Sequence, residues 1–201
     1  MQLITRKLGR SDYQQTLADM QVFTSKRTPV TPDELWLTEH DSIYTLGLNR
    51  KNVRLPNNEI PIVNVDRGGK ITYHGLGQIV IYCLIDLGRR KLKVRELVDI
   101  IEGSMITLLA RHNITAVSKK IAPGIYVDDK KIASIGLRLK NNCCYHGLSL
   151  NVDMDLSPFQ AIDPCGYTGL EMTQAIDLKV KETPAQIGDA LLDILKNRIE
   201  K

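Results

Sequence analysis

The chain has 201 residues, 43% of them hydrophobic and 25% charged, and 27 Lys and Arg against 23 Asp and Glu give a formal net charge of +4. This composition is typical of a soluble globular domain with a full hydrophobic core. Its longest apolar run, residues 79–85, is too short to span a bilayer, and residues 1–15 lack the apolar segment of a signal peptide. We therefore expect one cytoplasmic domain over residues 1–201, without a membrane anchor.

The charge, the few aromatic residues and the cysteines indicate which kinds of binding partner and metal site to expect. Basic residues are spread along the chain, and two Phe and one Trp are few for stacking on bases, so we expect no nucleic-acid partner. The slight positive excess fits either an ordinary solvated surface or a surface that attracts an acidic protein. In the cytoplasm Cys83, Cys143, Cys144 and Cys165 should be reduced thiols. No CxxC spacing occurs, so we expect no metal site.

The first half of the chain predicts one helix followed by strands. A helix is expected over residues 12–26, with Asp12 near its start. Strands are expected at 33–40 and 42–48, separated by a turn at His40 and Asp41. A polar loop at 51–59 and a strand at 60–65 follow. The glycine-rich segment 66–78 then leads into a strand of the buried type at 78–86.

The second half predicts two long helices around a group of strands. Helical periodicity covers residues 94–112. Strand runs over 115–152 are joined by turns at Asp128-Asp129 and Asn141-Asn142. Thr183 as N-cap, Pro184 and Gln186 predict a capped helix over 183–199. The chain is therefore expected to be α+β, a mixed and mostly antiparallel β-sheet with flanking helices packed on one face.

Two segments carry polar groups that could serve a site. Gly68, Gly69, Gly75 and Gly77 allow backbone N–H groups to approach a ligand, although a structural loop with bulges remains open. The segment fits neither of the common phosphate-binding patterns. Lys131 shares the strand face of Ala133 and Ile135 if the side chains alternate, and would then point inward. The alternative is a solvated hairpin edge that carries both Lys130 and Lys131.

Cys165 lies between Pro164 and Gly166, in a stretch rich in turn formers. A reactive thiol needs a nearby cation or helix N-terminus to form a thiolate at neutral pH. The candidates for the cation are His74, His146 and Lys131. From its own surroundings in the sequence, a reactive role for Cys165 is the less favoured reading, and a packing role stays open.

Five segments together resemble one family, the lipoyl(octanoyl) transferases of lipoate biosynthesis. They are PDELWLTEH at 32–40, RGGKITYHGLGQ at 67–78, APGIYVDDKKIASIGLR at 122–138, YHGLSLNVDMDLSPF at 145–159 and DPCGYTGLEMT at 163–173. The segments occur in the order and spacing of the family and cover roughly two thirds of the chain. One departure is Leu76, which stands where the family usually has proline.

The resemblance implies a fold like that of the biotin and lipoate ligase catalytic domains, and a function. The implied reaction moves an octanoyl or lipoyl group from acyl carrier protein to a lysine of a lipoyl domain or of the glycine-cleavage H protein. Cys165 would be the nucleophile that accepts the acyl group, and Lys131 would lower the pKa of its thiol. No cofactor is implied, and we expect a monomer. The implied substrate-binding residues are Arg67, Gly68, Gly69, Lys70, Ile71, Thr72, Tyr73, His74, Ser134, Ile135, Gly136, Gly147, Leu148 and Ser149.

Two other functions remain open at the level of the sequence. An ATP-dependent lipoate or biotin ligase would adenylate the free acid and would keep its activity without Cys165. The glycine- and arginine-rich nucleotide loop of biotin ligases is missing, which speaks against this reading. A non-catalytic module that binds an acyl group or a carrier protein would bind the carrier without turnover.

Overall fold

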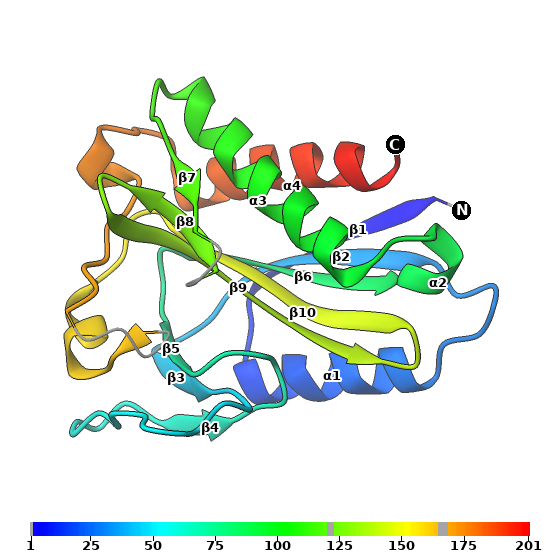
Figure 1. Ribbon diagram of the computed structural model, residues 1–201, viewed down its shortest axis with the longest axis horizontal. Coiled ribbons are helices and arrows are strands. Elements are labelled where there is room, and N and C mark those ends of the chain that lie inside the picture. The colour runs from blue at the N-terminus through cyan, green and yellow to red at the C-terminus, as the bar shows by residue number, and fades with distance from the viewer. Residues whose placement is uncertain (1, 120–122, 165–168) are drawn as a thin grey trace.

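The computed structural model describes residues 2–119, 123–164 and 169–201, which form two β-sheets and several helices (Figure 1). The larger sheet has the strand order β1 (Leu3–Arg10), β2 (Asp33–Glu39), β6 (Gln78–Asp86), β10 (Cys143–Asn151), β9 (Lys130–Lys140), β8 (Gly124–Val127), β7 (Val117–Ser118). Within it β1 and β2 are parallel and every other neighbouring pair is antiparallel. The predicted α+β class with a mostly antiparallel mixed sheet is confirmed.

The smaller sheet has three strands in the order β4 (Ile62–Asn64), β3 (Ile43–Leu46), β5 (Ile71–His74). It lies beside the N-terminal end of the first helix in Figure 1. Two strands were not predicted, β1 and β5. Of β1 only Leu3 is buried, so the strand carries no alternating apolar pattern and depends on its pairing with β2. β5 falls inside the glycine-rich segment. The glycines around it predict turns, so the four residues of the strand give no separate signal in the sequence.

Helices cover both faces of the larger sheet. α3 (Val94–Arg111) and α4 (Pro184–Ile199) lie on one face and α1 (Tyr13–Ser25) on the other (Figure 1). β6 explains this arrangement, because its alternate residues feed two cores. Ile81 belongs to the core under α3 and α4, whereas Tyr82 packs with residues of α1. The prediction that the helices share one face was therefore wrong, since a strand that is apolar on both sides needs cover on both.

The predicted hairpin turns are present. Asp128 and Asp129 have φ of 46° and 65°, and Asn141 and Asn142 have φ of 50° and 58°. Two successive left-handed residues match the right-handed twist of the strands that they join. The part of the chain that the structure describes also contains α2 (Leu87–Arg90) and the 3₁₀ helices Ser157–Ala161 and Ile176–Leu178. None of the described helices is both long enough and apolar enough to cross a membrane.

The start of α4 has the predicted capping box. The Thr183 hydroxyl accepts a hydrogen bond from the Gln186 backbone N–H, and the Gln186 side chain accepts one from the Thr183 N–H at 2.9 Å. Replacing Thr183 with alanine is expected to lower the free energy of unfolding by about 0.5–2 kcal/mol, because one helix N–H loses its partner. Urea denaturation would measure this. An unchanged midpoint would show that the cap does not contribute.

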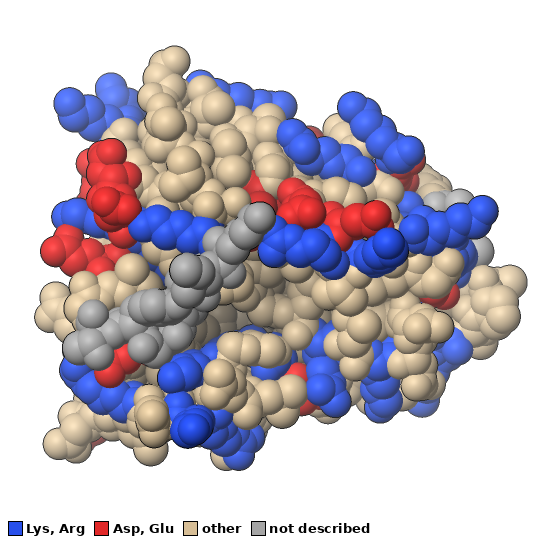
Figure 2. Space-filling model, viewed as in Figure 1, with Lys and Arg blue, Asp and Glu red and all other residues tan. Residues whose placement is uncertain are grey.

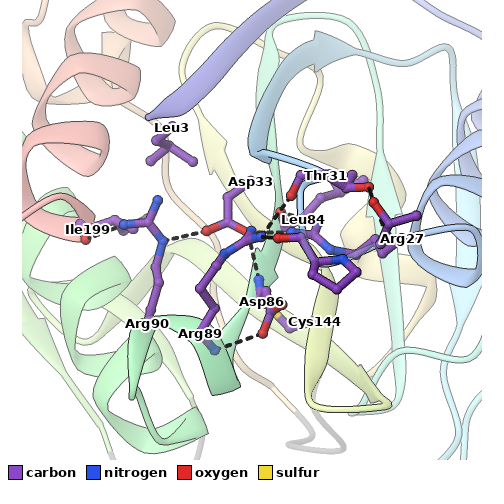
Figure 3. Close-up of polar contacts among 12 residues, drawn as sticks. Leu3, Arg27, Thr31, Asp33, Leu84, Asp86, Arg89, Arg90, Cys144 and Ile199 are labelled. Carbon is purple, nitrogen blue, oxygen red and sulfur yellow. Dashed lines mark hydrogen bonds and ion pairs between the residues drawn. The ribbon is translucent and has the colours of Figure 1, made fainter. Parts of the chain in front are cut away.

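The buried carboxylate of Asp33 connects the larger sheet to the C-terminal helix α4 through arginine side chains (Figure 3). Asp33, 1% exposed, accepts hydrogen bonds from Arg27, from Arg89 Nη2 at 2.6 Å and from Arg90 Nε at 2.5 Å. The backbone N–H of Asp86 donates a further bond at 2.8 Å. Arg90 also donates to the carbonyl of Ile199, the last residue of α4. One carboxylate thereby joins β2, β6, α2 and the C-terminal helix.

Candidate active site

A groove lies on the α1 face of the larger sheet, and a rung of three paired residues crosses its floor. Ser149 of β10 is opposite Ser134 of β9 on one side and Val80 of β6 on the other. The glycine-rich segment forms the wall of the groove that faces the sheet. The residues that line the groove are Tyr13, Arg67, Gly68, Gly69, Lys70, Ile71, Thr72, His74, Val80, Tyr82, Ser134, Ile135, Gly136, His146, Gly147, Leu148 and Ser149.

The glycine-rich wall is held close to the sheet by backbone and arginine contacts. The N–H of Gly68 donates to the carbonyl of Leu137 on β9 at 3.0 Å. A Cβ at Gly136 would lie 3.0 Å from Cδ of Arg67, so glycine permits this close approach. The Arg67 guanidinium, itself buried, donates to the Thr45 carbonyl at 2.7 Å and so fastens the segment to β3.

The structure brings together all of the predicted substrate-binding residues except Tyr73. Successive residues of a strand point to opposite sides. Thr72 and His74 line the groove, whereas the ring of Tyr73 packs against Tyr44 and Phe159 in a separate cluster. Tyr73 therefore does not line this groove.

Lys131 is buried, as its predicted inward position requires, but not for the predicted reason. Its side chain is 0% exposed, and its Nζ donates to the Pro123 carbonyl at 2.9 Å. Ile132 and Ala133 both enter the core cluster, because a bulge in β9 places Ala133 opposite Ile125 and Lys131 opposite Tyr126. Simple alternation therefore fails between Lys131 and Ala133, and it is the bulge that sets the direction of Lys131.

Residues 171–173, which come after Cys165 in the chain, run alongside Lys131. Cys165 itself lies outside the described residues. Further along the chain, the Glu171 carbonyl accepts from the Lys131 N–H at 2.8 Å, and the Thr173 N–H donates to the Lys131 carbonyl at 3.0 Å. The lysine is thus paired, at its backbone, with the chain six to eight residues beyond the cysteine.

A buried polar chain connects this segment to the groove. Nδ2 of Asn151 donates to the Thr173 carbonyl at 3.0 Å, and Oδ1 of Asn151 accepts from Nε2 of Gln78 at 2.9 Å. Oε1 of Gln78 in turn accepts from Nδ1 of His74 at 2.7 Å. The groove wall, β10 and the segment beside Lys131 are therefore held in one hydrogen-bonded arrangement.

The two candidate histidines line the groove, and burial lowers the pKa of both. Burial, with a repulsive contribution from His40, lowers the pKa of His74 to about 3. Burial also lowers the pKa of His146 below its ordinary value, against the opposing effect of Asp66. The hydrogen bond from His146 holds the pKa of the Asp66 carboxyl well below its usual range. Neither histidine is therefore well suited to serve as the cation beside a thiolate.

Four lining residues were not predicted as substrate-binding, namely Tyr13, Val80, Tyr82 and His146. Tyr13 comes from α1 and stacks on His74 with ring centroids 5.6 Å apart. Val80 and Tyr82 lie on the predicted buried strand, where an apolar pattern gives no signal that one face borders a groove. Among the described residues no group of three or more His, Cys, Asp or Glu could hold a metal ion, and the three described cysteines are free thiols.

Comparison with known proteins gives consistent results. The model of the family described as "Lipoyl protein ligase A/B catalytic domain" matches residues 12–193. An octanoyltransferase of Dechloromonas aromatica is 52% identical over 199 residues, which are 98% of this chain and 97% of that protein. One of Laribacter hongkongensis is 52% identical over 197 residues, covering 98% of this chain and 95% of that protein.

Solved structures resemble this chain in fold. Lipoate-protein ligase A bound with ATP has a TM-score of 0.81 at 13% identity, over 100% of this chain and 86% of that one. A bipartite lipoate protein ligase from Thermoplasma acidophilum, described with its E2 lipoyl domain, has a TM-score of 0.77 at 13% identity. The match covers 98% of this chain and 84% of that one. The biotin protein ligase of Aquifex aeolicus has a TM-score of 0.57 at 12% identity, and the match covers 100% of this chain and 69% of that one.

Proposed function

The chain belongs to the lipoyl protein ligase A/B catalytic domain family, and we propose that within it the chain, as one catalytic unit, is an octanoyltransferase that works through a thioester on Cys165. It transfers an octanoyl or lipoyl group onto proteins for lipoylation. One observation carries the mechanism. A fully buried lysine, Lys131, is paired through its backbone with Glu171 and Thr173, six and eight residues after Cys165.

The first step exchanges one thioester for another. The Cys165 thiolate attacks the carbonyl carbon of the octanoyl carrier thioester, the new C–S bond forms, and the carrier sulfur leaves and takes a proton from the Lys131 ammonium. The two thioesters are nearly equal in energy, so the acyl group stays reactive, as covalent catalysis requires. A serine ester would be a poorer acyl donor to an amine.

The second step forms the amide. The ε-amine of the acceptor lysine attacks the acyl-enzyme, the C–S bond breaks, and the neutral amine of Lys131 accepts the proton that the attacking nitrogen loses. The enzyme thereby regains its thiolate and its ammonium group. Backbone N–H groups near Ser134–Gly136 are candidates to stabilise the oxyanion of both steps.

The groove suits the acyl chain. Its lining is mostly apolar, as a site for a saturated chain should be. We assign to it the contacting residues Arg67 to Thr72, His74, Ser134 to Gly136 and Gly147 to Ser149, with the side chain of Tyr73 packed away from it. No nucleotide or metal enters this mechanism.

The partners follow from charge and from the relatives. The net charge of +4 favours an acidic donor, as acyl carrier proteins are, and Figure 2 shows more Lys and Arg than Asp and Glu on the face it displays. The acceptor is a lipoyl domain, the kind of protein named with the Thermoplasma relative, or the H protein of glycine cleavage. We propose that the enzyme acts as a monomer in the cytoplasm.

Intact-mass spectrometry tests the acyl-enzyme. Incubation with octanoyl carrier protein, without ATP, is expected to add one octanoyl group to the wild type and none to Cys165→Ala. Cys143→Ala is the matched control, because Cys143 is a buried thiol and burial raises its pKa above the ordinary value. That variant should keep the adduct. An adduct that survives in Cys165→Ala, or activity that requires ATP and free octanoate, would refute the mechanism.

A further inference from the structure

The groove has a near end and a far end relative to Lys131. Along β9, Ser134 lies three residues beyond Lys131 and Gly136 lies five beyond it. Gly136 is paired with Gly147 of β10, which is paired with Tyr82 of β6, so these three residues form a second rung across the floor. Five residues of strand span about 16 Å at most, since β9 carries the bulge at Ile132. This is enough for a cysteinyl sulfur and an octanoyl chain, whose eight carbons include the thioester carbonyl.

At the far end, His146 is turned into the groove by its backbone. Alternation along β10 would place it with Cys144 and Leu148, which both belong to the core under α3 and α4. Its φ is instead +60°, a left-handed conformation that costs a residue with a Cβ about 1–3 kcal/mol. The ring consequently lines the groove, stacked on Tyr145 at 5.1 Å, and its Nε2 donates to Asp66 Oδ1 at 2.9 Å.

The Tyr82 hydroxyl and Nε2 of His146 bond to residues that do not line the groove. The Tyr82 hydroxyl donates to Nε2 of His40 at 2.7 Å, while Nδ1 of His40 donates to the Ser11 carbonyl at 2.8 Å. Nε2 of His146 donates its hydrogen bond to Oδ1 of Asp66. Tyr82 is 3% exposed and His146 is 2% exposed, and their ring centroids are 6.4 Å apart. The two rings are therefore held in place by hydrogen bonds made outside the groove.

We propose that Tyr82 and His146 form the end wall of the acyl groove and set the length of the acyl chain that the enzyme transfers. The inference rests on the proposed function and adds to it the residues that determine specificity. The octanoyl chain passes over the rung of Ser134, Ser149 and Val80, and its methyl end stops at the wall. Longer chains are excluded because both rings are held by hydrogen bonds and cannot swing aside.

The test measures chain-length preference in the full-length enzyme. Acyl carrier protein loaded with hexanoyl, octanoyl, decanoyl or dodecanoyl groups is offered to each variant, and the rate of adduct formation is followed by intact mass. His146→Gly removes the ring at a position where glycine adopts the left-handed backbone without strain. We expect it to raise the decanoyl-to-octanoyl rate ratio by about tenfold, the effect of a methylene or more in an apolar pocket.

Two further variants keep the test decisive if His146→Gly folds poorly. Tyr82→Leu shortens the other half of the wall and should shift the preference in the same direction. Val80→Leu adds one methylene on the nearer rung and should shift the preference toward hexanoyl. Tyr44→Leu is the matched control, since Tyr44 is a buried tyrosine outside the groove lining, and its chain-length profile should equal that of the wild type.

The outcomes separate this inference from the proposed function. A normal octanoyl adduct with unchanged rate ratios in both His146→Gly and Tyr82→Leu would overturn the end wall and leave the acyl-enzyme intact. A wild type that forms no adduct with any chain would overturn the proposed function itself. A shift in Tyr44→Leu as large as that in Tyr82→Leu would show a general loosening of the fold and would also overturn the inference.

Discussion

Replacing Lys131 with methionine is expected to slow octanoyl transfer by about 10²–10⁴-fold, the range for loss of a positioned acid–base group. Methionine is unbranched and fills a similar apolar space, so the main loss is the ammonium group and its hydrogen bond to Pro123. Without a nearby cation the thiolate of Cys165 is less stable. The midpoint of the pH profile for alkylation of Cys165 should therefore move upward. Single-turnover acylation and iodoacetamide labelling measure the two effects.

The neighbouring lysine supplies the control. Lys130 is exposed and forms an ion pair with Glu171 at 2.8 Å, so Lys130→Met removes the same charge one residue away. We expect its transfer rate to stay within about twofold of the wild type, since exposed ion pairs contribute little. If Lys131→Met leaves the alkylation profile unchanged, Lys131 has no part in activating the cysteine.

Replacing Asp33 with asparagine is expected to lower the free energy of unfolding by about 3–5 kcal/mol, the usual effect of removing one partner from a buried ionic cluster. Arg27, Arg89 and Arg90 would then share one site without a counter-charge. Because single domains are stable by only about 5–15 kcal/mol, the variant should unfold at a clearly lower temperature. Thermal and urea denaturation measure the change.

The same cluster predicts the effect of acid. Burial alone would raise the pKa of Asp33, but hydrogen bonds from Asp86 and Arg90 and the charges of Arg90 and Arg27 outweigh burial and lower it. A carboxyl with a depressed folded-state pKa stabilises the protein fully above its unfolded pKa of about 3.9 and loses this effect as the pH falls further. The wild type should thus lose stability below about pH 4 more steeply than Asp33→Asn.

An exposed carboxylate is the matched control for Asp33. Asp189 pairs with Lys7 at 2.8 Å, and both side chains are about half exposed. Asp189→Asn should change the free energy of unfolding by less than about 0.5 kcal/mol. Equal losses in the two variants would mean that the Asp33 cluster is no more important than a surface pair.

Much of the fold was predictable because it depends on local signals. The capping box of Thr183 and Gln186 and the paired left-handed turns at Asp128-Asp129 and Asn141-Asn142 each need only residues close in sequence. The strand β1 could not be found in this way. Its pairing with β2 brings together residues about 30 positions apart, and only Leu3 of the strand is buried.

By itself the sequence determined the fold class, the family and the identity of the candidate reactive groups, since residue types and the order of motifs are properties of the chain. Only the tertiary structure decided which of these residues lie side by side and which way their side chains point. The direction of Lys131 follows from a bulge at Ile132, and the position of His146 from a left-handed backbone that reverses the expected side. Both are departures from regular strand geometry, which spacing cannot reveal because they depend on pairing with distant strands.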